Sequence, residues 1–367
     1  MRRALELAER GRGSTRPNPV VGAVIVRGGR VLAEGYHHCA GEAHGEIDAL
    51  AHVGGRAPGA TIYVNLEPCC HTGRTGPCTR ALIAAGVRRV VVGALDPNPR
   101  VDGRGVAQLR RAGIRVDVGC LEAECREANR GFFVWVSERR PLVTLKAAAT
   151  LDGFIAAPGG AREWITGPEA RRAAHRLRAA HDAILVGAGT VRSDDPQLTV
   201  RLPERDRASK ARPRRVVLDG RLSLRPRAQV LGAAAGAPPT LVIGARGADA
   251  RRVRALERAG AEVVLLPPAR GGRLPLSRVL AELGRRDIQS LLVEGGAHVH
   301  GALIDARLVD RVALFVAPKL LGAGIPIAQG GGVPVARALA LEPPTVEALG
   351  DDLLIRADVR GDVRVRR

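Results

Sequence analysis

The 367-residue chain has few aromatic residues, no long apolar run and only six cysteines. Trp, Tyr and Phe together make up 2% of its residues. Proteins that bind single-stranded nucleic acids usually stack bases on aromatic side chains, so this scarcity argues against such a role. No uninterrupted stretch of about 18 apolar residues occurs, and we therefore expect no membrane-spanning helix. Six cysteines are too few for a disulfide framework in a chain of this length.

Lysine is nearly absent as well. Lys146, Lys210 and Lys319 are the only lysines among 57 basic residues, so the net charge of +20 comes from arginine. The arginines are scattered and form no basic tail. We interpret this charge as a compositional bias toward arginine and do not expect nucleic-acid binding as the main function. The N-terminal residues include acids and lack the apolar core of a signal peptide, which predicts a cytoplasmic protein.

Length and hydrophobic patterning favour two domains, with a boundary near Ser137 to Pro141. Before this boundary, helical periodicity predicts helices at residues 3–12, 44–52, 79–85 and 106–112, and short apolar runs predict strands at 20–26, 31–35, 61–66, 89–93 and 114–118. Beyond it, we expect helices at 168–180, 250–259, 276–285 and 299–306, and strands at 142–147, 183–186, 215–219, 240–243, 262–266, 290–294, 311–317 and 353–359. This alternation predicts an α/β fold in both halves. Arg-, Pro- and Ala-rich residues 200–214 and 223–239 are expected to be surface loops.

One constellation of residues indicates chemistry. His44-Gly45-Glu46 precedes Cys69, and Cys78 follows after eight intervening residues. One His, two Cys and a nearby Glu are the residues of zinc deaminases, in which the Glu moves protons and does not bind the metal. Three protein ligands leave one coordination position open, which is typical of a catalytic zinc. The usual spacing between the cysteines is two residues, so this chain carries a variant of the signature.

Three alternatives stay open at this point. The chain could be a zinc deaminase of nucleosides or RNA bases with a non-catalytic second domain. The zinc could be purely structural, with His71 as a fourth ligand. A zinc-stabilised, arginine-rich nucleic-acid-binding protein is the third alternative. The remaining cysteines are interpreted as ordinary reduced thiols, namely Cys39, Cys70, Cys120 and Cys125.

Further motifs run through both halves. The first half contains Pro17-Asn18-Pro19-Val20-Val21-Gly22, Glu67-Pro68-Cys69 and Asp96-Pro97-Asn98-Pro99. The second half contains Thr150-Leu151-Asp152-Gly153, Trp164-Ile165-Thr166, Gly189-Thr190-Val191, Asp194-Asp195-Pro196, Val293-Glu294-Gly295-Gly296 and Ala317-Pro318-Lys319-Leu320-Leu321-Gly322. With these motifs the chain resembles the bacterial bifunctional deaminase/reductases of riboflavin biosynthesis, in the same domain order. The resemblance also implies a homo-oligomer.

For residues 1–140 the resemblance implies a cytidine-deaminase-like α/β/α domain. The implied reaction is zinc-dependent hydrolytic deamination of 2,5-diamino-6-ribosylamino-4(3H)-pyrimidinone 5′-phosphate. His44, Cys69 and Cys78 would hold Zn²⁺, Glu46 would be the catalytic proton carrier, and Asn18 would hydrogen-bond the substrate.

For residues 141–367 it implies a dihydrofolate-reductase-like domain that uses NADPH to reduce the ribosyl group to ribityl. No G-x-G-x-x-G follows a strand and opens a helix, so a Rossmann site is not indicated. The segments 187–190 and 295–297 are interpreted as glycine turns whose N–H groups approach phosphates. The cofactor contacts implied by position are Ala148, Trp164, Thr190, Asp194, Gly220, Gly296, Ala297, His298, Val299, His300, Gly301 and Ala302. The implied substrate contacts are Lys146, Asp152, Arg162, Arg178, Leu198, Arg201 and Glu294.

The chain departs from the family pattern at several positions. Near the metal motif, five residues differ from the usual Ala, His, Ser, His and Pro, namely Gly45, Asp48, Cys70, Thr72 and Gly76. No expected zinc ligand is lost. In the second half, Arg162 and Gly220 stand where the family usually has Ser. These two changes leave open that the reductase is the weaker half, with one domain active and the other a scaffold.

Overall fold

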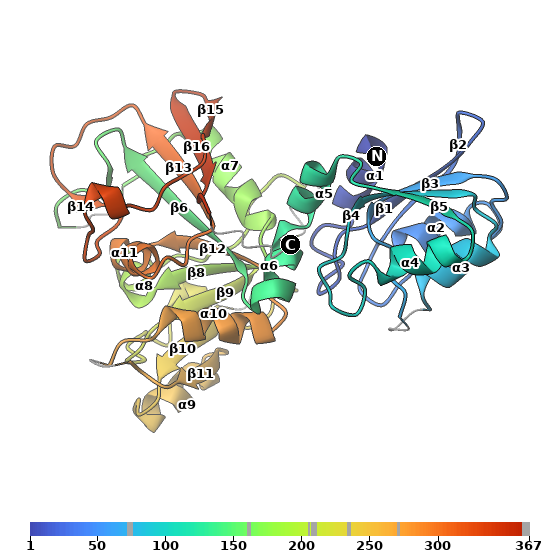
Figure 1. Cartoon of the computed structure of the whole chain (residues 1–367). Coiled ribbons are helices and arrows are strands. Elements are labelled where there is room, and N and C mark those ends of the chain that lie inside the picture. Colours follow the sequence, from blue (N-terminus) through green and yellow to red (C-terminus); the bar gives the residue numbers. More distant parts are fainter. Residues whose placement is uncertain are drawn as a thin grey trace. The chain divides into compact units, whose positions relative to one another are not determined.

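The computed structural model describes residues 1–71, 76–159, 163–204, 206, 211–232, 236–269 and 272–361 (Figure 1). The chain divides into two compact units, Met1–Arg139 and Arg140–Arg367, which we call unit 1 and unit 2. Both combine a sheet with surrounding helices, so the predicted α/β class is confirmed. Within the described ranges, every helix is too short or too polar to cross a membrane.

Unit 1 is built on a five-stranded sheet with the order β2-β1-β3-β4-β5. Strand β1 pairs antiparallel with β2 and β3, whereas β3, β4 and β5 run parallel. Helices α2, α3 and α4 lie on one face of this sheet, and α1 and α5 lie on the other (Figure 1). The elements are α1 (Arg2–Glu9), β1 (Gly22–Arg27), β2 (Arg30–Tyr36), α2 (Gly45–Ala51), β3 (Thr61–Leu66), α3 (Cys78–Ala84), β4 (Arg89–Ala94), α4 (Arg104–Arg111), β5 (Arg115–Val118), α5 (Glu122–Ala128) and α6 (Arg130–Glu138).

Strand β1 shows how the sequence produces the three layers of unit 1. Ala23 and Ile25 belong to the main buried cluster, while Val24 packs with Leu7 of α1. Successive residues of a strand point to opposite faces of the sheet, so apolar residues at every position require cover on both faces. The helices on the two faces provide that cover, and the polar residues of the site are left to the strand ends and loops.

Unit 2 contains a nine-stranded sheet with the order β11-β10-β9-β8-β12-β6-β13-β16-β15. The strands from β11 to β13 run parallel, and β16 pairs antiparallel with both β13 and β15. The main elements are β6 (Leu142–Thr150), α7 (Pro168–Ala179), β8 (Ala183–Gly187), α8 (Ala188–Asp194), β9 (Arg214–Leu218), β10 (Leu241–Ala245), α9 (Ala250–Arg258), β11 (Glu262–Leu266), α10 (Leu276–Arg285), β12 (Ser290–Gly295), α11 (Ala297–Asp305), β13 (Arg311–Ala317), β15 (Thr345–Leu349) and β16 (Asp352–Asp358). A small second sheet pairs β7 (Phe154–Ala156) with β14 (Ile325–Pro326), and two 3₁₀ turns are η2 (Gln229–Leu231) and η4 (Val335–Arg337).

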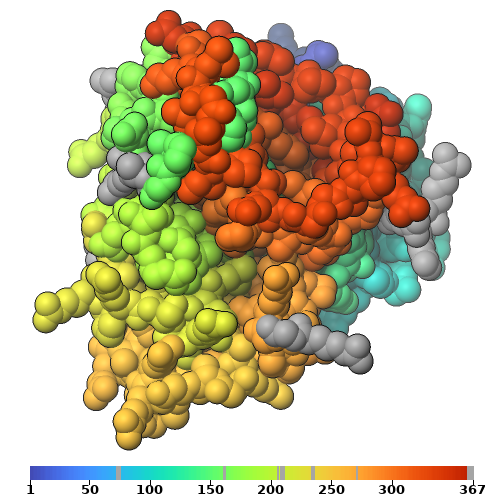
Figure 2. Space-filling view, turned by 90° about the vertical axis from the view of Figure 1, so that its left-hand side faces the viewer, coloured from blue at the N-terminus to red at the C-terminus, as the bar shows by residue number. Residues whose placement is uncertain are grey.

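The parallel strands of unit 2 are buried on both faces. Every residue of β8 is buried: Ala183 and Leu185 pack in the cluster that includes α10, and Ile184 and Val186 pack in the cluster that includes α8 and α9. Such continuous apolar runs are typical of parallel strands covered on both sides. The chain after β13, residues 318–344, is largely exposed and covers the upper part of the face in Figure 2, coloured orange to red.

Two predictions for unit 2 are wrong. The segment 187–190 is not a turn, because Gly187 caps the N-terminus of α8, which begins at Ala188. Residues 223–239 are not simply a surface loop: within their described part, Leu224, Val230 and Leu231 are buried. These side chains cover one face of the sheet beside β9 and β10, a tertiary role that a composition rich in Arg, Pro and Ala does not reveal. The sequence also gave no signal for α5, α6, β7, β14 or β15.

Candidate functional site

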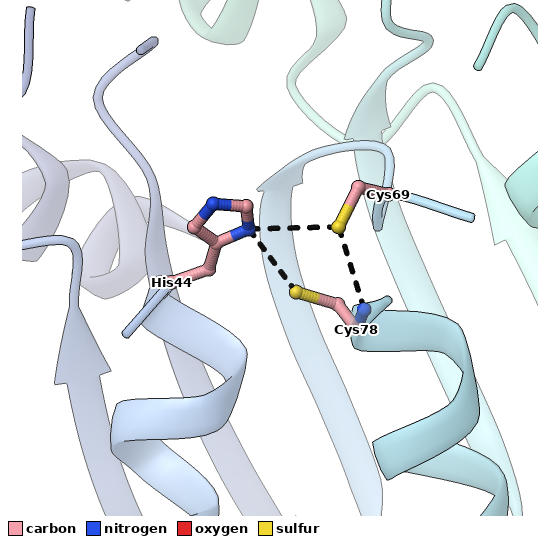
Figure 3. A group of neighbouring side chains, drawn as sticks. All are labelled: His44, Cys69 and Cys78. Atoms are coloured by element: carbon pink, nitrogen blue, oxygen red, sulfur yellow. Dashed lines mark hydrogen bonds between the residues drawn. The ribbon is translucent and has the colours of Figure 1, made fainter. Parts of the chain in front are cut away.

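Three side chains with metal-binding atoms meet at one end of unit 1 (Figure 3). His44 is the residue before α2, Cys69 follows β3 in a loop, and Cys78 is the first residue of α3. Nδ1 of His44 lies 3.6 Å from Sγ of Cys69 and 3.3 Å from Sγ of Cys78, and all three atoms lie within 4.8 Å of one another. Zinc bonds of about 2.0–2.3 Å in tetrahedral geometry give ligand separations of this size.

The surroundings of Cys69 suit a thiolate. The side chain of Cys78, the His44 ring and the backbone N–H of Cys78, whose nitrogen lies 3.4 Å from Sγ of Cys69, lower the pKa of the Cys69 thiol to about 4, against the opposing effect of burial. Zinc binds thiolate and neutral imidazole. The donor set and its spacing therefore fit a zinc ion held by His44, Cys69 and Cys78.

His71 does not join this group. It lines the same cavity, yet within the part of the chain that the structure describes only His44, Cys69 and Cys78 bring their ligand atoms together. A closed structural zinc site needs four protein ligands. The arrangement of three therefore favours an open, catalytic site.

Glu46 lies in the first turn of α2, beside the metal ligands. It is 2% exposed, and its Oε2 atom is buried with no hydrogen-bond partner among the described residues. Burial raises the pKa of this carboxyl to about 7, although the neighbouring His44 opposes the shift. A buried polar atom without a partner is costly unless a bound molecule meets it. A carboxyl group in this state suits proton transfer to and from a reactant near neutral pH.

His44, Cys69, Glu46 and Asn18 line a cavity of about 310 Å³, whereas Cys78 does not line it. Nδ2 of Asn18 lies 3.0 Å from Nε2 of His37, and Nδ1 of His37 lies 2.9 Å from the carbonyl oxygen of Ala43. The His37 ring therefore donates through Nδ1 and accepts from Asn18, a tautomer assigned from its hydrogen bonds. Burial lowers the pKa of His37, which keeps the ring neutral. Sequence reasoning missed His37, which holds the Asn18 amide in the cavity.

Two buried asparagines fix the loop that carries Asn18. Asn129 accepts from the N–H of Val20 at 2.8 Å and donates to its carbonyl oxygen at 2.9 Å. Asn65 donates to the same carbonyl at 3.0 Å and accepts from the N–H of Gly22 at 2.8 Å. Asn65 and Asn129 are 0% and 4% exposed. These side chains replace backbone partners at Val20, and no local sequence pattern indicates that they meet there.

Glu67, in the Glu-Pro-Cys motif, is structural. Its carboxylate accepts from the N–H groups of Gly103 at 2.9 Å, Val106 at 3.0 Å and Asp96 at 3.3 Å. This ties the metal-binding loop to the loop after β4, where Asp96 lines the cavity and burial raises the pKa of its carboxyl to about 7. Asp48, a departure from the family pattern, accepts from the Tyr36 N–H and does not line the cavity.

Unit 2 has a second cavity, of about 710 Å³, at the carboxyl ends of β6, β8 and β12. Ligands of parallel α/β sheets bind at this edge. Among the residues expected at the cofactor, those that line it are Ala148, Thr190, Asp194, Gly296, Ala297, His298, Val299 and His300. Among those expected at the substrate, the lining residues are Lys146, Arg178, Leu198 and Glu294.

A buried charge cluster forms one wall of this cavity. Arg178 of α7 donates two hydrogen bonds of 2.6 Å to the two carboxylate oxygens of Glu294. Lys146 lies on β6, with Nζ 5.5 Å from the centre of the Phe315 ring. Burial would raise the pKa of Glu294, but the charges of Arg178 and Lys146 outweigh it and lower the value to about 2. The two cations and one anion leave the cluster with one excess positive charge, which suits a phosphorylated ligand.

Two glycines beside this cavity allow the starts of α8 and α11 to pack closely together. Gly296 precedes α11 and donates its N–H to Oγ1 of Thr190 at 3.0 Å, and a Cβ at Gly296 would lie 3.0 Å from the same oxygen. A Cβ at Gly187 would lie 2.9 Å from Val299. Gly295 ends β12 and Gly296 lies between it and the start of α11, so residues 295–297 form the glycine turn expected after this strand. The cavity volume falls in the usual range for cofactor sites, and the fit to NADPH is good.

Several residues expected in unit 2 do not line the described cavity. Trp164 is 63% exposed, and the Arg171 guanidinium lies 4.5 Å from the centre of its ring. The Asp152 carboxylate accepts from the N–H groups of Leu321 and Gly322 at 2.9 and 2.7 Å, so it ties two loops together.

None of the other expected residues that the structure describes lines this cavity. Arg201 is exposed, and its guanidinium donates to Oγ1 of Thr199 at 3.1 Å. A Cβ at Gly220 would make ordinary van der Waals contact with Leu274, Gly301 packs against residues 329–330, and Ala302 is exposed. Arg162 and Thr72 lie outside the described residues.

Comparison with known proteins identifies both halves. Residues 1–94 match the cytidine and deoxycytidylate deaminase zinc-binding region, and residues 141–355 match the RibD C-terminal domain. Riboflavin biosynthesis protein RibD of Aquifex aeolicus (strain VF5) is 42% identical over 355 residues, which cover 97% of this chain and 96% of that protein. RibD of Escherichia coli (strain K12) is 44% identical over 330 residues, 88% of each chain.

Solved structures agree. Acinetobacter baumannii RibD, form 1, superposes with a TM-score of 0.87 at 38% identity and covers 98% of this chain and 97% of its own. A Thermotoga maritima protein described as a diaminohydroxyphosphoribosylaminopyrimidine deaminase/5-amino-6-(5-phosphoribosylamino)uracil reductase gives a TM-score of 0.84 at 37% identity, with the same coverage. The predicted pairing of a cytidine-deaminase-like and a dihydrofolate-reductase-like fold is thus confirmed. A non-catalytic second domain is not supported. The chain belongs to the RibD family of bifunctional riboflavin-biosynthesis enzymes, which join a zinc-dependent deaminase to an NADPH-dependent reductase.

Proposed function

We propose that unit 1 deaminates 2,5-diamino-6-ribosylamino-4(3H)-pyrimidinone 5′-phosphate and that unit 2 reduces the ribosyl group of the product to ribityl. The observation that carries the first half is the meeting of His44, Cys69 and Cys78 beside Glu46, whose buried Oε2 has no hydrogen-bond partner among the described residues. The Lys146–Arg178–Glu294 cluster in the larger cavity supports the second half. The Thermotoga maritima relative is described as a deaminase and a reductase for these two steps.

In the deaminase, Zn²⁺ held by His44, Cys69 and Cys78 would supply Lewis-acid activation of water. Glu46 would accept the proton of the attacking water and deliver protons to the ring nitrogen and the departing amine. Its raised pKa makes both transfers accessible near neutral pH. Asn18, oriented by His37, would hydrogen-bond the pyrimidine and keep the reacting carbon beside Glu46.

In the reductase, NADPH would supply the hydride that adds to C1′ of the ribose. C1′ already carries four bonds, so its bond to the ring oxygen must break before or as the hydride arrives, and that oxygen takes up a proton. Lys146 is the ammonium group that lines the cavity, and burial lowers its pKa, so it is the donor we assign. Arg178, held by Glu294 on one edge, would position the phosphorylated substrate.

The test is a single assay with zinc-loaded protein, the diaminopyrimidinone ribosyl phosphate and NADPH. Ammonia and NADPH absorbance are followed together, and we expect ammonia first and NADPH oxidation after it. A chelator should stop ammonia release but leave NADPH oxidation intact when the deaminated product is supplied. Deamination without NADPH oxidation would overturn the reductase assignment, and no change in either signal would overturn the substrate.

We also propose that the protein acts in the cytoplasm as a homo-oligomer. On the β15–β16 hairpin, Val346 and Leu353 are 60% and 39% exposed and lie on the same face, and β15 is an open edge of the sheet. A second copy covering this face would remove the apolar surface from water. Light scattering should report a dimer or larger species that Val346→Lys dissociates, and a monomeric wild type would refute self-association.

A further inference from the structure

Arg192 of α8 lines the cavity of unit 2 on the side of β9, and sequence reasoning gave it no role. Its Nη1 donates to Oγ of Ser223 at 3.0 Å, and Ser223 donates to Oδ1 of Asp219 at 3.1 Å. Asp219 is 3% exposed, and its other oxygen accepts from the N–H of Leu224 at 2.8 Å. A buried carboxylate therefore fixes a hydroxyl, and the hydroxyl fixes the guanidinium at the cavity.

The position of Arg192 identifies which end of a dinucleotide would reach it. The sheet order is β9-β8-β12-β6, and strands lie about 4.8 Å apart, so the β9 side is roughly 14 Å across the sheet from Lys146 on β6. On the proposed function, the nicotinamide must lie beside Lys146 and Glu294, where the substrate binds. An extended cofactor would then place its adenosine half toward β9.

The chemistry of this end of the cavity fits a phosphate. In the described part of the chain, Arg192 forms no ion pair, and its one hydrogen bond is to a neutral hydroxyl. The remaining N–H groups of the guanidinium stay available as a planar fork, which matches phosphate oxygens. Asp194, on the same helix, also lines the cavity. An acid near the ribose favours the free 2′-hydroxyl of NADH, whereas an arginine accommodates the 2′-phosphate of NADPH.

We propose that Arg192 binds the 2′-phosphate of NADPH and selects NADPH over NADH. This inference rests on the proposed reductase function of unit 2. Ser223 is a positioning residue, because it acts through the guanidinium that it orients.

The experiment is a titration of the zinc-loaded full chain with NADPH and with NADH, followed by the fluorescence of the bound nucleotide. Arg192→Ala should weaken NADPH binding by about tenfold to a hundredfold, the range for a hydrogen bond to a charged group. Binding of NADH should change by less than about threefold. Ser223→Ala should weaken NADPH binding by a smaller factor in the same direction. Arg254→Ala removes an equal charge from the exposed face of α9 and should change neither affinity.

An equal loss for both nucleotides, or no loss for NADPH, would overturn the role of Arg192 while leaving the reductase function in place. Arg192→Lys guards against an effect of folding, because it keeps the charge and loses only the planar fork. It should retain part of the preference for NADPH. Wild-type protein that binds neither nucleotide would overturn the proposed reductase function, and the selection by Arg192 with it.

Discussion

Each of the two cavities contains a buried carboxylate, and the surroundings shift the pKa values of the two groups in opposite directions. Glu46 of unit 1 has a buried oxygen with no hydrogen-bond partner among the described residues, and burial raises the pKa of its carboxyl group to about 7. Glu294 of unit 2 accepts two hydrogen bonds from Arg178, and nearby cations lower its pKa to about 2 despite burial. Burial alone therefore does not decide protonation; the neighbouring charges do.

This difference assigns different work to the two residues. A carboxyl group whose pKa lies near 7 can release and regain a proton during a reaction. One whose pKa lies near 2 remains an anion at every physiological pH and can only hold cations in place. When their surroundings give two carboxyl groups different pKa values, the groups take different roles. The predictions below test that separation, beginning with the largest expected effect.

Glu46→Gln should remove the proton carrier and leave the metal group intact. We expect the rate of ammonia release to fall by about 10²- to 10⁴-fold, the usual contribution of a positioned acid–base group. Zinc content should be unchanged, because Glu46 is not a ligand. NADPH oxidation with the deaminated product supplied is the control and should continue at the wild-type rate. Ammonia release at the normal rate would show that Glu46 is not the proton carrier and would refute its contrast with Glu294.

Glu294→Gln should instead act on stability and binding. The substitution leaves Arg178 and Lys146 buried without their anion, and breaking a buried pair typically costs about 3–5 kcal/mol. Denaturant unfolding should show this loss, and NADPH oxidation should fall while ammonia release persists. Glu262→Gln is the matched control, because Glu262 pairs with Arg214 and Arg286 but is 38% exposed, so its loss should cost less than about 1 kcal/mol. Equal losses would mean that burial does not distinguish the two pairs.

The sequence pointed to the three side chains that lie together in unit 1 because local motifs carry them. His44, Cys69 and Cys78 each begin or follow a regular element, and helix and strand periodicity indicated those elements closely. Their convergence followed from zinc chemistry and the family resemblance. The alternating pattern likewise predicted nearly all core strands of both units.

The residues that position the site were not predictable in this way. His37, Asn65 and Asn129 act through partners 19 to 109 positions away in the sequence, and single polar residues give no periodic signal. Arg192 could not be distinguished among so many arginines until the structure placed it at a cavity. Helix α6 was missed although Phe132 and Phe133 are buried. Its apolar residues are nearly continuous, which obscures helical periodicity.

The stability of unit 2 should depend on acid through Glu294. In the unfolded chain this carboxyl takes up a proton near its ordinary pKa of 4.5, whereas in the folded unit it does so only near 2. Between these values the unfolded state binds more protons, so stability is fully present above about pH 4.5 and is lost as the pH falls toward 2. The shift corresponds to something on the order of 3 kcal/mol.

Unfolding measured from pH 7 to pH 2 for the wild type and for Glu294→Gln gives the test. The wild type should be more stable than Glu294→Gln above about pH 4.5. This difference in the free energy of unfolding should disappear as the pH falls toward 2, because glutamine does not titrate. A difference between the two proteins that stays constant down to pH 2 would show that Glu294 is not held as an anion by Arg178 and Lys146.

The smallest effect concerns how each cavity fixes its loops. In unit 2 an ion pair joins α7 to β12, whereas in unit 1 neutral amides hold the loop of Asn18, and Asn129 makes two hydrogen bonds to the backbone of Val20. Asn129→Ala should leave the N–H of Val20 unpaired and cost about 1–3 kcal/mol. Because Asn18 lies two residues before Val20, we expect KM for deamination to rise several-fold with little change in kcat. Asn129→Asp keeps the acceptor for Val20 N–H and should restore part of the affinity. A fall in kcat with unchanged KM would place Asn129 in the chemical step. Asn129 would then no longer differ from Glu46, which we assign to proton transfer, by acting only on the position of the loop.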